Sequence, residues 1–341
     1  MLIKRLMVCR LRLIIGFLIT FLISGGIMQS HASDALCAKD HGVKQHTLKS
    51  LRKLLRSQRN VPFKIPTAMR YQHAKHLFKQ LFEMPMKIHG TEQIDSLKST
   101  PTGSIIDELA KKAGLCGQWL QVSHLKQKYR VLLFMENPAT AEGQGAYLFA
   151  FNRPLGFVIQ APHQYFDYST GHIALQLFFE NNLRALSINT VHRKQTSQSD
   201  MAHYADNLFS AFTEAMAETT SEDSAAKQTG PYLVQLHGFS NQHRKKEAGK
   251  KAHIILSNGS RSPSISLQKS QNILNTTSPF KTYLYGVDID ELGGTKNSSL
   301  AIFSGFNLQP QFIHIELSAN TRINLKTSRR KREQLWSSLQ P

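Results

Sequence analysis

The chain has 341 residues, of which 41% are hydrophobic, and its 42 Lys and Arg against 23 Asp and Glu give a formal net charge of +19. This length allows one large domain or two ordinary ones, and the 19% charged residues, 12 Pro and 3 Cys exclude a disordered chain, a collagen-like repeat and a disulfide-dense miniature scaffold. The basic balance favours acidic polymers or anionic substrates, and the absence of any nucleic-acid-binding module argues against nucleic acid as the partner.

Residues 1–32 have the pattern of a secretory signal peptide. Basic residues from Lys4 to Arg12 precede an apolar run at 13–28, which is shorter than the about 20 residues that span a bilayer. Small residues Ser30 and Ala32 then form a cleavage pattern. We expect a periplasmic or secreted protein with no transmembrane anchor after cleavage; an uncleaved anchor is the alternative.

Export has a consequence for the cysteines. Cleavage removes Cys9 and leaves Cys37 and Cys116. Two cysteines in an oxidising compartment most simply form one disulfide, so we expect these two to pair.

Residues 33–127 are predicted to form a basic, helical N-terminal region. Amphipathic helical patterns cover 46–58, 69–84 and 104–115, with leucines on one face and Lys or Arg elsewhere. These basic faces are typical of solvated surfaces, and a membrane or polyanion contact is the alternative.

The pattern changes after residue 128, where short apolar runs alternate with helical segments. Strand patterns cover 129–135, 146–151, 156–161, 184–193, 232–239, 253–259, 283–289 and 312–318, and helical patterns cover 172–182 and 201–219. Such alternation predicts an α/β domain at 128–325, with a mixed sheet flanked by helices. Residues 326–341 are predicted to be a basic tail.

Polar residues at strand ends are the candidates for a site, because ligands of α/β sheets bind at the carboxyl ends of strands. His163, Asp167 and His237 have the composition of a zinc site with an open position. Glu316, inside an apolar strand, is the candidate for proton transfer. The alternatives are a helix cap for Asp167, an ion pair with Arg322 or another basic residue for Glu316, and hydrogen-bonded loop residues for the histidines.

The order of these residues resembles the zinc carboxypeptidase superfamily, especially the amidohydrolase branch with N-formylglutamate amidohydrolases and poly-γ-glutamate hydrolases. The order is a His with a nearby carboxylate, an Asn…Arg pair, a second His and a late Glu. The resemblance implies zinc ligation by His163, Asp167 and His237, a substrate-binding Arg193 and a water-activating Glu316. The acid follows the first His by four residues, where the superfamily typically has three. Further substrate-contact candidates are Asn189, His192 and His203.

The predicted function is therefore an exported zinc-dependent amide or peptide hydrolase, which acts through metal-activated water on a carboxylate-bearing substrate. Peptides, γ-glutamyl chains and peptidoglycan-type fragments fit this prediction. A serine hydrolase is disfavoured because the chain lacks the G-x-S-x-G pattern. The alternative function is a non-catalytic exported module that binds an acidic polymer or an envelope partner through its basic helices.

Overall fold

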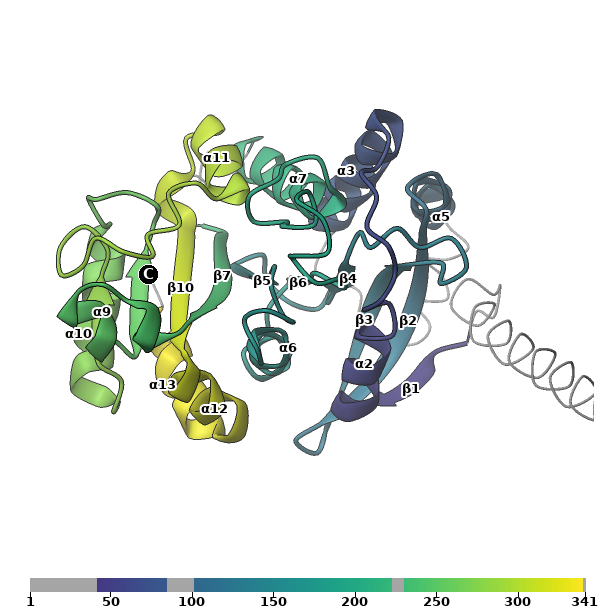
Figure 1. Cartoon of the computed structure of the whole chain (residues 1–341). Helices are drawn as coiled ribbons and strands as arrows, with labels where there is room; N and C mark the ends of the chain where they lie inside the picture. Colours follow the sequence, from purple (N-terminus) through teal and green to yellow (C-terminus); the bar gives the residue numbers. More distant parts are fainter. Residues whose placement is uncertain (1–41, 85–100, 223–229, 340–341) are drawn as a thin grey trace, which may run out of the picture.

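The computed structural model describes residues 42–84, 101–222 and 230–339, which form a mixed sheet covered by helices on both faces (Figure 1). The sheet has ten strands in the order β1-β2-β3-β4-β6-β5-β7-β10-β8-β9. The predicted fold class, a mixed α/β sheet flanked by helices, is confirmed. The strands are β1 Lys44–Thr47, β2 Leu115–His124, β3 Gln127–Glu136, β4 Ala146–Phe149, β5 Phe157–Ala161, β6 Ala185–Ile188, β7 Tyr232–Phe239, β8 Ile254–Ser257, β9 Thr282–Leu284 and β10 Phe312–Ser318.

Four central strands run in the same direction. β5 pairs in parallel with β6 on one side and β7 on the other, and β10 pairs in parallel with β7. The flanking strands β4 and β8 pair with β6 and β10 in antiparallel fashion. The carboxyl ends of β6, β5, β7 and β10 therefore lie along the same edge of the sheet.

The helices form one layer on each face. In Figure 1, α3, α7 and α11 lie above the sheet, and α6, α12 and α13 lie below it. Apolar residues on alternate positions of the strands pack against the two layers, as expected for strands buried on both faces. The helices are α2 Leu48–Leu55, α3 Ala68–Glu83, α5 Pro101–Lys112, α6 Thr170–Glu180, α7 Leu208–Glu222, α9 Glu247–Lys251, α10 Ile265–Thr277, α11 Ser298–Gly305, α12 Ala319–Thr327 and α13 Arg329–Ser338, with short 3₁₀ turns at Asn241–His243 and Gln309–Gln311.

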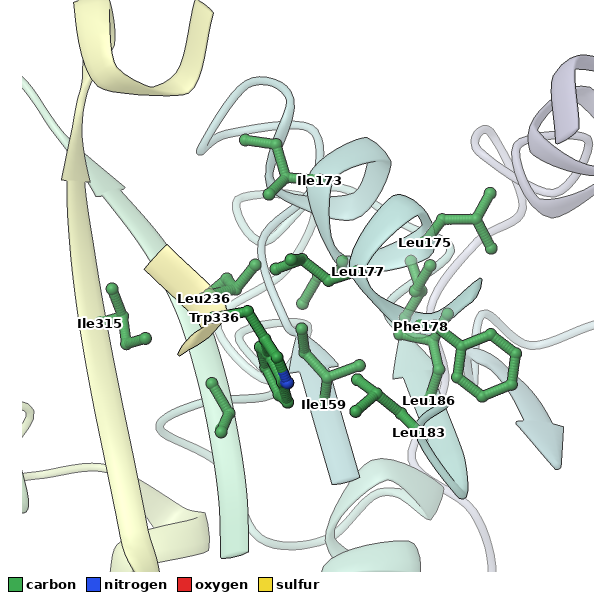
Figure 2. Close-up of a cluster of buried hydrophobic side chains, with 14 of the residues drawn as sticks. Ile159, Ile173, Leu175, Leu177, Phe178, Leu183, Leu186, Leu236, Ile315 and Trp336 are labelled. Atoms are coloured by element: carbon green, nitrogen blue, oxygen red, sulfur yellow. The ribbon is translucent and has the colours of Figure 1, made fainter. Parts of the chain in front are cut away.

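The larger core lies between the sheet and the layer that contains α6 and α13. Figure 2 shows Ile159, Leu236 and Ile315, from three neighbouring strands, on the side of the sheet that Trp336 covers. All four side chains are buried. Because Trp336 belongs to α13, the last helix of the described chain is part of this core.

Two of the predicted regions contain structure that the sequence patterns did not indicate. The region 33–127 contributes strands β1 and β2 as well as helices, and the boundary at 127/128 falls at the β2–β3 hairpin. The predicted basic tail at 326–341 contains the end of α12 and the whole of α13. This last helix forms because Leu335 and Trp336 are buried and Arg332 pairs with Glu180.

Two predicted elements are shorter than their sequence patterns. The strand predicted at 184–193 ends at Ile188, because Asn189 Oδ1 accepts a hydrogen bond from the backbone of Val191 in a turn. The helix predicted at 201–219 begins at Leu208, where Asn207 Oδ1 accepts from the backbone N–H of Ser210.

The predicted signal peptide and Cys37 lie outside the described residues, so cleavage, export and the Cys37–Cys116 disulfide remain predictions. Among the residues that the structure describes, no helix has the length and apolar character needed to cross a bilayer.

Candidate metal centre

The candidate site lies at the carboxyl ends of β5, β7 and β10. His163 follows β5 by two residues, whereas His237 and Glu316 lie within β7 and β10. The register of these parallel strands places Glu316 opposite His237 and His314 opposite Gln235. The sheet thus brings together residues that are up to 153 positions apart.

The three predicted ligands converge on one carboxylate oxygen. Asp167 Oδ2 lies 3.3 Å from Nδ1 of His163 and 3.5 Å from Nδ1 of His237. The two imidazole centroids are 4.9 Å apart, and all three side chains are buried. A backbone hydrogen bond of 2.7 Å from Asp167 N to His163 O closes the turn that brings Asp167 back beside His163.

The second nitrogen of each imidazole has its own acceptor. His163 Nε2 lies 2.8 Å from Asp200 Oδ1, and His237 Nε2 lies 2.7 Å from Gln235 Oε1. Because carboxylate and amide oxygens accept hydrogen bonds, both rings donate from Nε2. In the neutral form each ring therefore directs a lone pair on Nδ1 toward Asp167, as metal-binding histidines with an outer hydrogen-bond partner do.

Burial and neighbouring charges set the protonation of these groups. Burial lowers the pKa of His237 to about 4, although Asp167 partly opposes this shift. Burial alone would lower the pKa of His163, but its hydrogen bonds to the carboxylates of Asp167 and Asp200 raise it above the usual value. Burial alone would raise the pKa of Asp167, but its contacts with the rings of His163 and His237 hold it well below its usual range. Asp167 is therefore an anion at neutral pH.

Among the described residues, three groups of side chains bring their ligand atoms within 4.8 Å of one another and could hold a metal ion. The first is His163, Asp167 and His237, all buried. The other two share its histidines: His163 with Asp200 and His203, and His237 with His314 and Glu316. Imidazole nitrogens with buried carboxylate oxygens are a donor set that suits a divalent transition metal.

Glu316 lies in the same buried region as the ligands. Its Oε1 is 3.9 Å from His314 Nε2, and its Oε2 is buried without a hydrogen-bond partner among the described residues. Burial, followed by the negative charge of Asp167, raises the pKa of Glu316 well above its usual value. Arg322 instead donates to the backbone oxygens of Phe239 and Leu317, so the alternative of a Glu316–Arg322 ion pair is not observed in the described chain.

Arg193 is the predicted substrate-binding residue that lies nearest to the ligands. Its NH2 group forms an ion pair with Asp200 Oδ2, and its NH1 group lies 3.1 Å from Nδ1 of His163. Its side chain is partly exposed. Arg193 therefore lies between the buried ligands and solvent.

The other predicted contact residues have different surroundings. Asn189 is fully buried, and its amide donates to the backbone oxygen of Pro162 at 2.9 Å. His192 is partly exposed and packs edge-on against Phe166, with ring centroids 5.9 Å apart. His203 is exposed, with Nδ1 3.0 Å from Asp200 Oδ1. Asn189 therefore holds backbone in place, whereas His192 and His203 reach the surface.

Sequence reasoning missed three members of the site. These are Asp200, Gln235 and His314, which bind or pack against the predicted ligands. Gln235 could have been found from alternation, because it precedes His237 by two residues and so shares its face of β7. The Gln235 amide also forms buried hydrogen bonds with the side chains of Gln160, Asn297 and Ser299.

Comparisons with known proteins found no matching family model and no matching curated protein. A bacteriophage poly-gamma-glutamate hydrolase structure is 9% identical, with a TM-score of 0.33 over 55% of this chain and 83% of that one. An aspartoacylase family protein from Mesorhizobium loti is 10% identical, with a TM-score of 0.32 over 66% of each chain. A glutaminyl cyclase from an Acidobacteriales bacterium is 11% identical, with a TM-score of 0.29 over 83% of this chain and 96% of that one. Because these TM-scores are below 0.5, the function must be inferred from the site itself.

Proposed function

We propose that this chain is an exported zinc-dependent hydrolase that cleaves an amide bond in a carboxylate-bearing substrate. The observation that carries the proposal is the convergence of His163 and His237 on Asp167, with Nδ1 of each ring directed to the same carboxylate oxygen. A purely structural role would be met by the hydrogen bond that each ring makes at Nε2, and it would not require both Nδ1 atoms to face one carboxylate oxygen.

His163, Asp167 and His237 would hold the zinc ion. Two imidazoles and one carboxylate are a common ligand set for catalytic zinc, and three protein ligands leave a coordination position open. A bound zinc ion supplies Lewis acidity, which lowers the pKa of water to about 7 and polarises a carbonyl group. Asp200 and Gln235 would fix the two rings in the tautomer that ligation requires.

Glu316 is the residue that we assign to proton transfer. Its buried Oε2 has no partner among the described residues, so this oxygen is available to take a proton from water and return it to the leaving nitrogen. Burial raises the pKa of Glu316, which makes its carboxylate a stronger base for the proton that it takes from water and later returns.

Arg193 is assigned to the substrate carboxylate. Its partly exposed guanidinium lies next to His163, so an anion bound there would lie close to the ligands. His192 and His203 would contact substrate at the exposed rim. Asn189 is buried and uses its amide on backbone groups, so we assign it a positioning role in place of the predicted substrate contact.

The substrate class that fits these assignments is a peptide, a γ-glutamyl chain or a peptidoglycan-type stem peptide. Each contains an amide bond near a carboxylate.

The test is amine release from γ-glutamyl and α-glutamyl peptides by the zinc-loaded protein. We expect activity that a chelator abolishes and added zinc restores, and that His163→Ala lacks. His253→Ala is the matched control, because His253 lies on the surface and, within the described chain, its ring only accepts a hydrogen bond from the backbone N–H of Lys281, just before β9. If the zinc-loaded protein releases no amine, or if release is unaffected by the chelator and by His163→Ala, the proposal is wrong and the exported binding module is the better hypothesis.

A further inference from the structure

Two arginines stack on an aromatic ring beside the candidate metal centre. The guanidinium carbons of Arg56 and Arg59 lie 5.1 and 5.0 Å from the ring centroid of Tyr165. Tyr165 belongs to the same turn as the ligands His163 and Asp167. The turn that carries two ligands therefore also positions two cations from the end of α2.

A second aromatic ring in this turn is also covered by cations. Phe166 is 46% exposed, and Lys194 Nζ and the Arg193 guanidinium carbon lie 4.8 and 5.2 Å from its ring centroid. His192 packs edge-on against the same ring. Cations thus stack on both neighbouring rings, Tyr165 and Phe166. One of them, Arg193, also lies next to the buried ligand His163.

The outer cations lack acidic partners within the described part of the chain. Arg56, Arg59 and Lys194 form no ion pair there, whereas buried or half-buried cations elsewhere, such as Arg70 and Lys75, are each paired with two carboxylates. Arg56 and Arg59 also repel each other, because both charges lie against one ring. An anion placed between them would relieve this repulsion.

The positive charges of these cations also affect the neighbouring side chain of His192. Burial, followed by the charges of Arg59 and Lys194, lowers the pKa of His192. His192, which packs against Phe166, therefore lies within the electrostatic field of cations from both groups.

We propose that Arg56, Arg59 and Lys194 form a second anion-binding subsite, which holds carboxylates of the substrate away from the bond that is cleaved. The proposal rests on the proposed function and narrows its substrate class to an oligomeric acidic chain, with carboxylates on several successive units. Guanidinium groups are suited to this because their planar donors bind carboxylates in pairs while their faces stack on aromatic rings. A substrate with one carboxylate would use Arg193 alone.

Binding without turnover tests this subsite. γ-Linked and α-linked pentaglutamate are titrated calorimetrically into zinc-loaded Glu316→Gln protein, with and without Arg56→Gln/Arg59→Gln. We expect the double substitution to raise the Kd of the better-bound pentaglutamate at least about tenfold, and to weaken the binding of a peptide with one carboxylate less than twofold.

The matched control is Lys49→Gln/Lys53→Gln, which removes the same charge from exposed positions of α2 that do not stack on Tyr165. This control should change the Kd less than twofold. An equal loss in the control, or an unchanged Kd in the arginine variant, would overturn the subsite. Oligothymidylate serves as a phosphate-bearing probe in the same titration. The subsite for carboxylates would also be overturned if the affinity for oligothymidylate depended on Arg56 and Arg59 and the affinity for both pentaglutamates did not.

The same titration separates this proposal from the hydrolase proposal. If pentaglutamate binding depends on Arg56 and Arg59 but the wild-type protein never releases amine, the subsite is retained and the hydrolase is rejected. If amine release depends on zinc but the arginines do not affect pentaglutamate binding, the hydrolase is retained and the subsite is rejected.

Discussion

His163 and His237 are each held by one hydrogen bond at Nε2, to Asp200 and Gln235 respectively. These bonds orient the rings so that both Nδ1 atoms face Asp167. Outer hydrogen bonds of this kind set both the tautomer and the basicity of a ligand. A change in an outer partner should therefore weaken metal binding without removing a ligand.

Replacement of Asp200 tests this role. Asp200→Asn removes the charge but keeps the shape, and we expect zinc affinity to fall by about 10- to 100-fold. The measurement is competition against a chromogenic chelator. Asp206→Asn, at an exposed position, is the control and should leave the affinity unchanged. Equal affinities of wild type and Asp200→Asn would show that Asp200 does not support the ligand.

Replacement of Glu316 separates proton transfer from ligation. Glu316→Gln keeps the volume but cannot accept a proton, so we expect kcat to fall at least about 100-fold while zinc content is unchanged. Activity is followed by amine release and zinc by elemental analysis. A variant that retains its activity would contradict the assigned role, and a variant that loses zinc would make Glu316 a ligand.

At the scale of elements, buried side chains connect the helical layers with the sheet. Arg184, at the start of β6, is fully buried and donates from NH2 to the backbone oxygens of Leu81 and Met84 at the end of α3. It has no acidic partner among the described residues, and burial lowers its pKa to about 10. The guanidinium thus satisfies carbonyl groups that the helix end leaves unpaired.

Arg184→Met should therefore destabilise the protein. The substitution fills similar space but leaves buried carbonyls without donors, which should lower the free energy of unfolding by about 3 kcal/mol. Urea unfolding measures the change. Arg329→Met, at an exposed position, should cost less than about 0.5 kcal/mol. If Arg184→Met lowers the free energy of unfolding no more than the control does, water can replace the guanidinium as the donor to these carbonyl groups.

The contact between α2 and α6 should depend on pH. His172 Nδ1 lies 3.1 Å from Arg52 NH1, and burial followed by the charge of Arg52 lowers the pKa of His172 to about 4. In the unfolded chain His172 takes up a proton near pH 6.5, whereas in the folded chain it does so only near pH 4. The stability that depends on neutral His172 is therefore fully present above about pH 6.5 and is lost as the pH falls toward 4.

His172→Gln keeps an acceptor for Arg52 but cannot take up a proton. We expect wild type to lose about 1 kcal/mol more than this variant between pH 7 and pH 4, a value reduced for the partial exposure of His172. Urea unfolding at several pH values measures the difference. His243→Gln, at an exposed position, should follow wild type. Parallel curves for wild type and His172→Gln would contradict the predicted shift.

At the scale of the whole molecule, one sheet joins the N-terminal and C-terminal parts of the described chain. Local patterns predicted the central strands and many of the helices, because periodicity within 10 to 20 residues reports burial. They did not predict that β10 lies beside β7, because apolar alternation does not specify which distant strand is the partner. That pairing is what brings Glu316 to His237.

The same limit applies to the site. His163, Asp167 and His237 could be selected from the sequence because they are potential metal ligands at the carboxyl ends of strands, where α/β sheets bind ligands. Asp200 could not, because a loop Asp is common and its role arises only through a contact between distant residues. Gln235 shares a face of β7 with His237, but the sequence does not show that its amide binds the ring. The predicted disulfide includes Cys37, which lies outside the described residues together with the predicted signal peptide, so both remain predictions.

The central claim is tested most directly by the zinc content of the purified protein after dialysis, measured by elemental analysis. We predict about one zinc ion per chain in wild type, and less than about a tenth of that in His163→Ala and His237→Ala, with circular dichroism showing that both variants are folded. Wild-type protein without stoichiometric metal, or folded variants that retain as much zinc as wild type, would contradict it.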